Sequence, residues 1–323
     1  MNDDETAGRR RHYGQFYGIE PLPEDNAGRT GRIGGGTRPL VVLWGNCQAE
    51  ALRQLLQGSP SDAIRSVRLP PVHELTADDL PHVARVLATA DVLLAQPVAD
   101  DYRGLPLGTR QVGALLPDGG RVVRWPVLFD AALYPFQVLV RHESAGDPPV
   151  VPYHDLRTLI EAATGRRPRS GDAAAASRRY VELAERSRAA LAARERRHAT
   201  VVVSDQLAKR SDRTALDFHT INHPGNRMLL AAAHAAQLAL RLEPDAVDPR
   251  RVLLNAVLTP QQPDVLEALG LTPAPGRDAW LLAGERVEDE VVRSAHLAFY
   301  REHPGFIEAG LHRHADTIKA LGL

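Results

Sequence analysis

The chain has only one cysteine among its 323 residues. A single thiol excludes an internal disulfide framework and a thiolate zinc cluster, and it is typical of a reducing cytoplasm. The formal net charge is −1, so the composition gives no electrostatic reason to expect nucleic acid or an anionic membrane as a partner. No apolar run approaches the roughly 20 residues of a membrane span, and the N-terminus lacks the apolar core of a signal peptide. We therefore predict a cytoplasmic protein with no membrane span.

Several signature motifs are also missing. The sequence contains no HExxH zinc motif and no GxxxxGK[ST] phosphate loop. Three glycines at 34–36 precede the first predicted strand, whereas a dinucleotide fingerprint follows one. His219 and His223 are four residues apart, but Pro224 argues against the continuous helix that would place both on one face. The sequence therefore predicts no catalytic metal.

Strands alternating with helices are the main pattern that is present. Hydrophobic residues make up 44% of the chain, which suffices for a sizeable core. Apolar, β-branched runs predict strands at 40–44, 64–69, 91–95 and 121–125, with amphipathic helices among them. This alternation predicts an α/β fold in three layers, with a central, mostly parallel sheet flanked by helices. In such sheets, functional residues collect at the carboxyl ends of the strands.

Composition also suggests how the chain is divided. Residues 1–37 have little periodicity and are predicted to be a flexible leader, although their three aromatic residues could dock onto the body. Residues 38–245 are predicted to form the α/β catalytic domain. Residues 246–323 are predicted to be a mainly helical C-terminal extension, which either covers a binding site or forms a contact in a homo-oligomer.

The cysteine lies where a predicted strand meets a predicted helix. The sequence around it is Gly45-Asn46-Cys47-Gln48, and Gly45 allows a tight turn. A thiol at a helix N-terminus faces unpaired N–H groups and the positive end of the helix dipole, and both favour the thiolate. The position therefore predicts an activated nucleophile, although free cysteines are also often small buried core residues.

A cysteine nucleophile needs a base, and His223 is the best candidate among the 13 histidines. It lies in Thr220-Ile221-Asn222-His223-Pro224, where the proline favours a loop before the next helix. Asn222 or Thr220 could orient its ring, or His223 could simply cap that helix. Asp217 and His219 are alternatives for the orienting acid and the base.

Amides and arginines supply the other candidates. Asn46, Gln48 and Gln96 follow predicted strands and could aim N–H groups at an oxyanion. Amides at turns also occur for purely structural reasons. Arg53 and Arg227 are among the basic side chains available for phosphate groups.

Together, the GNCQ run, the later Gln96-Pro97 and the TINHP run resemble the WcbI-type polysaccharide biosynthesis family over roughly residues 40–245. The resemblance implies a topology similar to that of the SGNH/GDSL hydrolases. It implies acyl transfer, acetyl in the first instance, from coenzyme A during capsular polysaccharide synthesis. By position, Cys47 takes the place of the SGNH serine, His223 is the base, and Gly45, Asn46, Gln48 and Gln96 surround the oxyanion. No DxxH motif precedes the helix, so the acid of a triad is in doubt.

Three functions are therefore compatible with the sequence. The leading one is transfer of an acyl group from acyl-coenzyme A, through Cys47, to a hydroxyl of a saccharide or another small-molecule acceptor. A thioesterase or esterase would use the same Cys–His site with water as the acceptor. A non-catalytic module that binds coenzyme A or a saccharide would need neither residue for chemistry.

Overall fold

A computed structural model describes residues 3–24, 38–142, 146–168, 171–208 and 213–323. The chain forms two compact units, each assembled from separated stretches. Unit 1 contains residues 1–127, 192–203 and 226–252, and unit 2 contains residues 128–191, 204–225 and 253–323. The glycine run at 34–36 lies outside the described residues.

A parallel four-stranded sheet forms the centre of unit 1. Its order is β2-β1-β3-β4, and its strands are β1 (Leu40–Trp44), β2 (Arg65–Val67), β3 (Val92–Ala95) and β4 (Arg121–Arg124). All side chains of β1 and β3 are buried, because helices cover both faces of the sheet. The predicted parallel sheet is therefore confirmed.

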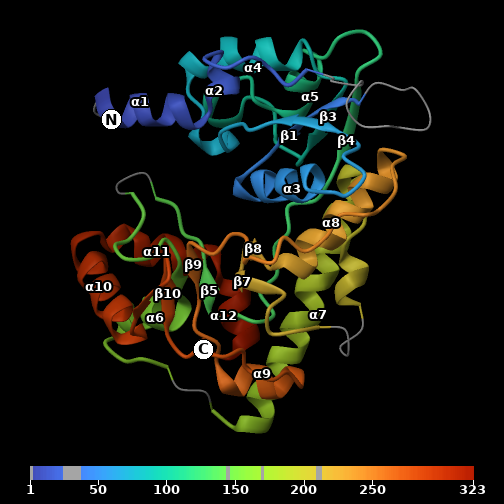
Figure 1. The fold of residues 1–323 in the computed structure, drawn as a ribbon. Coiled ribbons are helices and arrows are strands. Elements are labelled where there is room, and N and C mark those ends of the chain that lie inside the picture. The colour runs from blue at the N-terminus through green and yellow to red at the C-terminus, as the bar shows by residue number, and fades with distance from the viewer. Residues whose placement is uncertain (1–2, 25–37, 143–145, 169–170, 209–212) are drawn as a thin grey trace. The chain divides into compact units, whose positions relative to one another are not determined.

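Helices complete the three layers of unit 1. The helices α2 (Gly14–Tyr17), α4 (Leu80–Leu87) and α5 (Thr109–Gly113) cover one face, and α3 (Cys47–Gln57) and α8 (Asn226–Ala239) lie on the other (Figure 1). Alternate side chains of β1, among them Val42 and Trp44, join the core beneath α4. The helices α3 and α8 pack directly against each other.

Part of the predicted flexible leader is helical and docked. Helix α1 spans Asp3–His12, and α2 follows it directly. Phe16 is fully buried in the core of unit 1, and the Tyr17 hydroxyl donates to Asp79 at 2.9 Å. The leader prediction is thus wrong for this stretch, because three aromatic side chains outweigh its polar composition.

Unit 2 combines small antiparallel sheets with helices. Two strand pairs are β5 (Gln137–Val138) with β6 (His154–Asp155) and β7 (Phe218–Thr220) with β8 (His223–Pro224). A third sheet has the order β11-β10-β9, formed by β9 (Val257–Leu258), β10 (Trp280–Leu282) and β11 (Glu285–Val287). The helices are α6 (Leu156–Thr164), α9 (Pro263–Leu269), α10 (Asp289–Glu302), α11 (Pro304–Arg313) and α12 (Ala315–Leu321). Helix α7 (Ala173–His198) contributes residues to both units.

The two units differ from the predicted domain division. Residues 253–323, which are most of the extension predicted at 246–323, pack with residues 128–191, which were assigned to the catalytic domain. This region is helical in large part, but it also contributes β9, β10 and β11. Composition could not show these long-range pairings, because the chain passes between the units several times. Among the described residues, no helix has the length and apolarity that crossing a bilayer requires.

Candidate functional site

Cys47 is the first residue of α3 and follows the carboxyl end of β1 after a two-residue turn. The neighbouring strand β3 pairs with β1 through Trp44 and Ala95, so Gln96 emerges beside the turn. The Gln96 backbone N–H donates to the Trp44 carbonyl at 2.8 Å. Cys47 and Gln96 therefore both follow strand ends, as predicted, and the structure shows that the two strands are neighbours.

Buried amides hold this turn in shape. Gln96 Oε1 accepts from the Asn46 backbone N–H at 2.9 Å, and Gln96 Nε2 donates to Gln48 Oε1 at 3.0 Å. The Asn46 side chain caps α3 by accepting from the Gln48 backbone N–H at 2.9 Å. A Cβ on Gly45 would lie 2.3 Å from Gln96 Oε1, so only glycine fits there. In these bonds the Gln96 amide and the Gln48 backbone N–H hold the turn together, and their predicted role at an oxyanion stays a prediction.

Burial dominates the chemistry of the thiol. It raises the pKa of Cys47 to about 11, although the backbone N–H groups of Cys47 and Gln48 favour the thiolate. The Glu74 carboxylate adds a smaller contribution in the same direction as burial. The predicted activation by the helix N-terminus is thus outweighed, because desolvation destabilises the thiolate more than two backbone N–H groups stabilise it. Cys47 is a protonated thiol at neutral pH.

The two arginines proposed for phosphate binding differ in their surroundings. Arg53 is held by Glu50, with Nε to Oε2 at 2.7 Å and Nη2 to Oε1 at 2.9 Å. It also donates to Ser66 Oγ at 3.2 Å, and its carboxylate partner Glu50 is shared with Arg68 at 3.4 Å. Arg227 is the second residue of α8 and therefore lies in the first turn of that helix, where anions are favoured.

His223 belongs to a short hairpin in unit 2. It pairs with Thr220 across β7 and β8, and its backbone N–H donates to Thr220 Oγ1 at 3.1 Å. A loop was predicted here from Pro224, whereas the structure has a short hairpin of paired strands. Pro224, Gly225 and Asn226 follow, and the chain passes into unit 1 between the last two.

A hydroxyl cluster surrounds the base of this hairpin. Thr220 Oγ1 lies 3.0 Å from both the Tyr153 hydroxyl and Asn222 Oδ1, and Tyr153 donates to Asn222 at 2.8 Å. The Tyr153 ring meets the His223 ring edge-on, with their centroids 6.2 Å apart. The predicted residues Thr220, Asn222 and His223 are therefore brought together. Tyr153 was missed, because nothing in the local sequence shows that the segment containing β6 lies beside this hairpin.

Asp217 and His219 serve other contacts. The Asp217 carboxylate accepts from the backbone N–H and hydroxyl of Thr214, at 3.0 and 2.9 Å, and so closes the turn before β7. The His219 ring is buried, and its two nitrogens have no hydrogen-bond partner within the described part of the chain. These contacts give no support to Asp217 as the orienting acid.

Both histidines of the hairpin are neutral at physiological pH. Burial lowers the pKa of His223 to about 4. Burial, followed by the charges of Arg277 and His223, lowers the pKa of His219 to about 4. A neutral imidazole can accept a proton, which is the state that a general base requires. Over the described ranges, no cluster of three or more histidine, cysteine or acidic side chains could hold a metal ion.

Comparisons with known proteins agree with the resemblance seen in the sequence. The family model described as polysaccharide biosynthesis enzyme WcbI matches residues 40–245. A solved structure of WcbI, described as a novel polysaccharide biosynthesis enzyme, is similar to this chain with a TM-score of 0.73 and 19% sequence identity. The similarity covers 88% of this chain and 98% of that one. That structure is described as the native protein without a disulfide bond between coenzyme A and one of its cysteines. No curated protein matches the chain.

Proposed function

Since the chain belongs to the family of the polysaccharide biosynthesis enzyme WcbI, we propose that it is an acyltransferase. The donor is a thioester of coenzyme A, with acetyl-coenzyme A as the first candidate, and the acceptor is a saccharide hydroxyl. Cys47 is the nucleophile and His223 is the general base. The observation that carries the proposal is the braced turn that fixes the only thiol of the chain at the carboxyl end of the central strand. The description of the similar WcbI structure, which names coenzyme A and a cysteine together, supports the choice of donor.

The first half of the reaction forms an acyl-enzyme. The Cys47 thiol gives its proton to the neutral His223 imidazole as Sγ attacks the thioester carbonyl of acyl-coenzyme A. The carbon–sulfur bond to coenzyme A then breaks, and the departing coenzyme A thiolate takes the proton back from His223. A thioester is exchanged for a thioester, so this step needs no other energy source.

The second half returns the enzyme to its starting state. His223 removes the proton from an acceptor hydroxyl, whose oxygen attacks the acyl carbon on Cys47. An ester forms, and the Cys47 sulfur leaves with the proton held by His223. A thiol pKa of about 11 means that little thiolate exists beforehand, so proton transfer has to accompany the attack.

Coenzyme A also carries phosphate groups, which need a cationic site. Arg227 in the first turn of α8 combines a guanidinium with the positive end of a helix. His223 lies three residues before that helix, and α8 packs against α3, which begins with Cys47. Arg53 in α3, whose guanidinium contacts Glu50, is a second candidate.

Release of coenzyme A from acetyl-coenzyme A tests this assignment. We expect pooled saccharide acceptors to stimulate release by the wild type, and Cys47→Ala and His223→Ala to lower it by about 100-fold or more. His312→Ala, which removes an exposed histidine, is the matched control and should behave as the wild type. Equal release with and without acceptors would indicate the thioesterase function instead, and full activity in both site variants would contradict the mechanism.

A further inference from the structure

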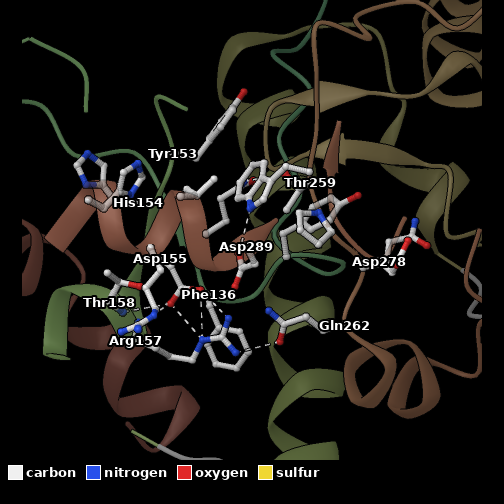
Figure 2. Close-up of a pocket in the computed structure, with 18 of the residues that line it drawn as sticks. Phe136, Tyr153, His154, Asp155, Arg157, Thr158, Thr259, Gln262, Asp278 and Asp289 are labelled. Carbon is white, nitrogen blue, oxygen red and sulfur yellow. Dashed lines mark hydrogen bonds and ion pairs between the residues drawn. The ribbon is translucent and has the colours of Figure 1, made fainter. Parts of the chain in front are cut away.

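Unit 2 contains a pocket of about 290 Å³, and none of the residues predicted to form the site lines it. Its walls come from β5, β6, the first turn of α6, the segment 259–263, β10 and α10 (Figure 2). Ligand pockets span roughly 300–1,000 Å³, so this one is at the small end of the range. It suits one sugar-sized ring and is too small for a whole coenzyme A molecule.

The charges in the pocket are balanced. Arg157 is paired with Asp155, with Nη2 to Oδ2 at 2.5 Å and Nε to both carboxylate oxygens (Figure 2). Arg293 donates to Glu290 at 2.6 Å and also to Glu161. Because each of these guanidiniums already has a carboxylate, the pocket offers little net positive charge to a phosphate group. A neutral ligand is therefore favoured over a phosphorylated one.

Aromatic rings and polar groups line the same space. The Trp280 indole is fixed by donating its N–H to Asp289 at 2.9 Å, and the Phe136 ring is covered by the Arg157 guanidinium at 4.0 Å. Gln262 and Thr259 supply an amide and a hydroxyl at the wall. Because Arg157 covers Phe136, the Trp280 indole is the one of these two aromatic groups that is left for a ligand. An indole beside hydroxyl and amide groups matches a sugar, which has an apolar C–H face and a rim of hydroxyls.

His154 is the buried histidine of the pocket wall. It is fully buried, lines the pocket, and has its Nδ1 2.5 Å from the Tyr300 hydroxyl. Its ring also stacks on the Tyr300 and Phe306 rings, with centroids 5.6 Å away in each case. These contacts fix the imidazole at the pocket wall.

The pocket also adjoins the hairpin that carries His223. Tyr153 lines the pocket and donates to Asn222. Gln137 is a second shared residue, because its Oε1 accepts from the Ile221 backbone N–H at 2.9 Å while its Nε2 donates to Thr259 at 2.9 Å. Two pocket side chains therefore reach the segment 220–223 directly.

From these features we propose that the pocket binds one neutral saccharide unit and presents a hydroxyl of that unit beside Tyr153, next to His223. Its role as the acceptor site rests on the proposed function, whereas saccharide binding itself does not. The side chains that select the sugar are Trp280, Gln262, Thr259 and His154.

Saturation-transfer NMR with methyl glycosides of glucose, galactose, mannose and N-acetylglucosamine tests the proposal. We expect at least one of them to bind the wild type and Cys47→Ala equally. Trp280→Leu should weaken that binding tenfold or more, and Gln262→Ala, a milder change in a partly exposed side chain, should weaken it severalfold. Val291→Ala, on the exposed face of α10, is the control and should bind as the wild type. Coenzyme A should shift the melting temperature of all variants equally.

Two results would overturn the proposal. One is the absence of binding by every glycoside, and the other is unchanged binding in both Trp280→Leu and Gln262→Ala. Loss of the coenzyme A shift in these folded variants would also overturn it, because the pocket would then belong to the donor. If glycosides bind as expected but Cys47 is never acylated, the saccharide site stands and the proposed function fails.

Discussion

At the residue scale, the reactivity of Cys47 is set by a competition between burial and backbone N–H groups. The sequence shows the second effect, because a helix start can be predicted from local spacing. It does not show the first, because burial of a side chain depends on segments that are distant in the sequence. In the structure burial has the larger effect on the pKa, so Cys47 is a protonated thiol.

The pH dependence of alkylation tests this outcome. A thiol with a pKa of about 11 is roughly 0.03% thiolate at pH 7.5, and its thiolate fraction rises tenfold with each pH unit up to the pKa. We therefore expect the iodoacetamide rate of Cys47, followed by mass spectrometry, to rise about tenfold per unit from pH 7 to 10. A rate that levels off near pH 8 would show instead that the helix N-terminus stabilises the thiolate.

Local sequence pointed to most residues of the turn at Cys47 and of the hairpin at His223, but not to the distant segments that contact them. Cys47, Gln96, Thr220, Asn222 and His223 lie beside strand ends or turns, and such positions can be recognised from a few adjacent letters. Tyr153 and the pocket around Trp280 could not be found in this way. Their contacts join segments more than 60 residues apart in sequence, as between Tyr153 and Asn222.

At the element scale, the strand-to-helix turn depends on a glycine. The Cβ of an alanine at position 45 would lie 2.3 Å from Gln96 Oε1 and 2.8 Å from its Cδ. Gln96 is buried and holds both Asn46 and Gln48, so it cannot move without breaking these bonds.

We expect Gly45→Ala to lower the free energy of unfolding by about 1–3 kcal/mol, the usual cost of forcing extra atoms into a packed site. It should also lower acylation of Cys47, because the turn that positions the thiol is distorted. Urea denaturation measures the first effect. Gly171→Ala is the control, since its added Cβ has no described atom within 4 Å apart from its own chain neighbours. Equal stability of the two variants would show that the turn tolerates a side chain.

Strong periodicity made the elements of unit 1 predictable. All four predicted strands of its sheet are confirmed, with ends shifted by a few residues at most. The short strands of unit 2 were harder to predict, because strands of only two or three residues are too short to show a hydrophobic period. Helix α2 was not predicted, since its four residues cannot show a pattern, although docking of its aromatic residues was expected as an alternative.

At the scale of the whole molecule, the chain interleaves its two units. The α/β core matches the family over residues 40–245, yet residues within that range also build unit 2. The segment 217–227, which the sequence singled out, is where the chain crosses from unit 2 to unit 1. Linear composition cannot show such a crossing, so the predicted division at residue 245 does not follow the packing.

The central claim is that Cys47 carries the acyl group, and intact-protein mass spectrometry after mixing with acetyl-coenzyme A tests it most directly. We predict that the wild type gains the mass of one acetyl group, that Cys47→Ala gains none, and that His223→Ala gains it far more slowly. Peptide mapping should place the added group on Cys47. An acetyl group that also appears on Cys47→Ala, or a wild type that stays unmodified while it turns over acetyl-coenzyme A, would contradict the account.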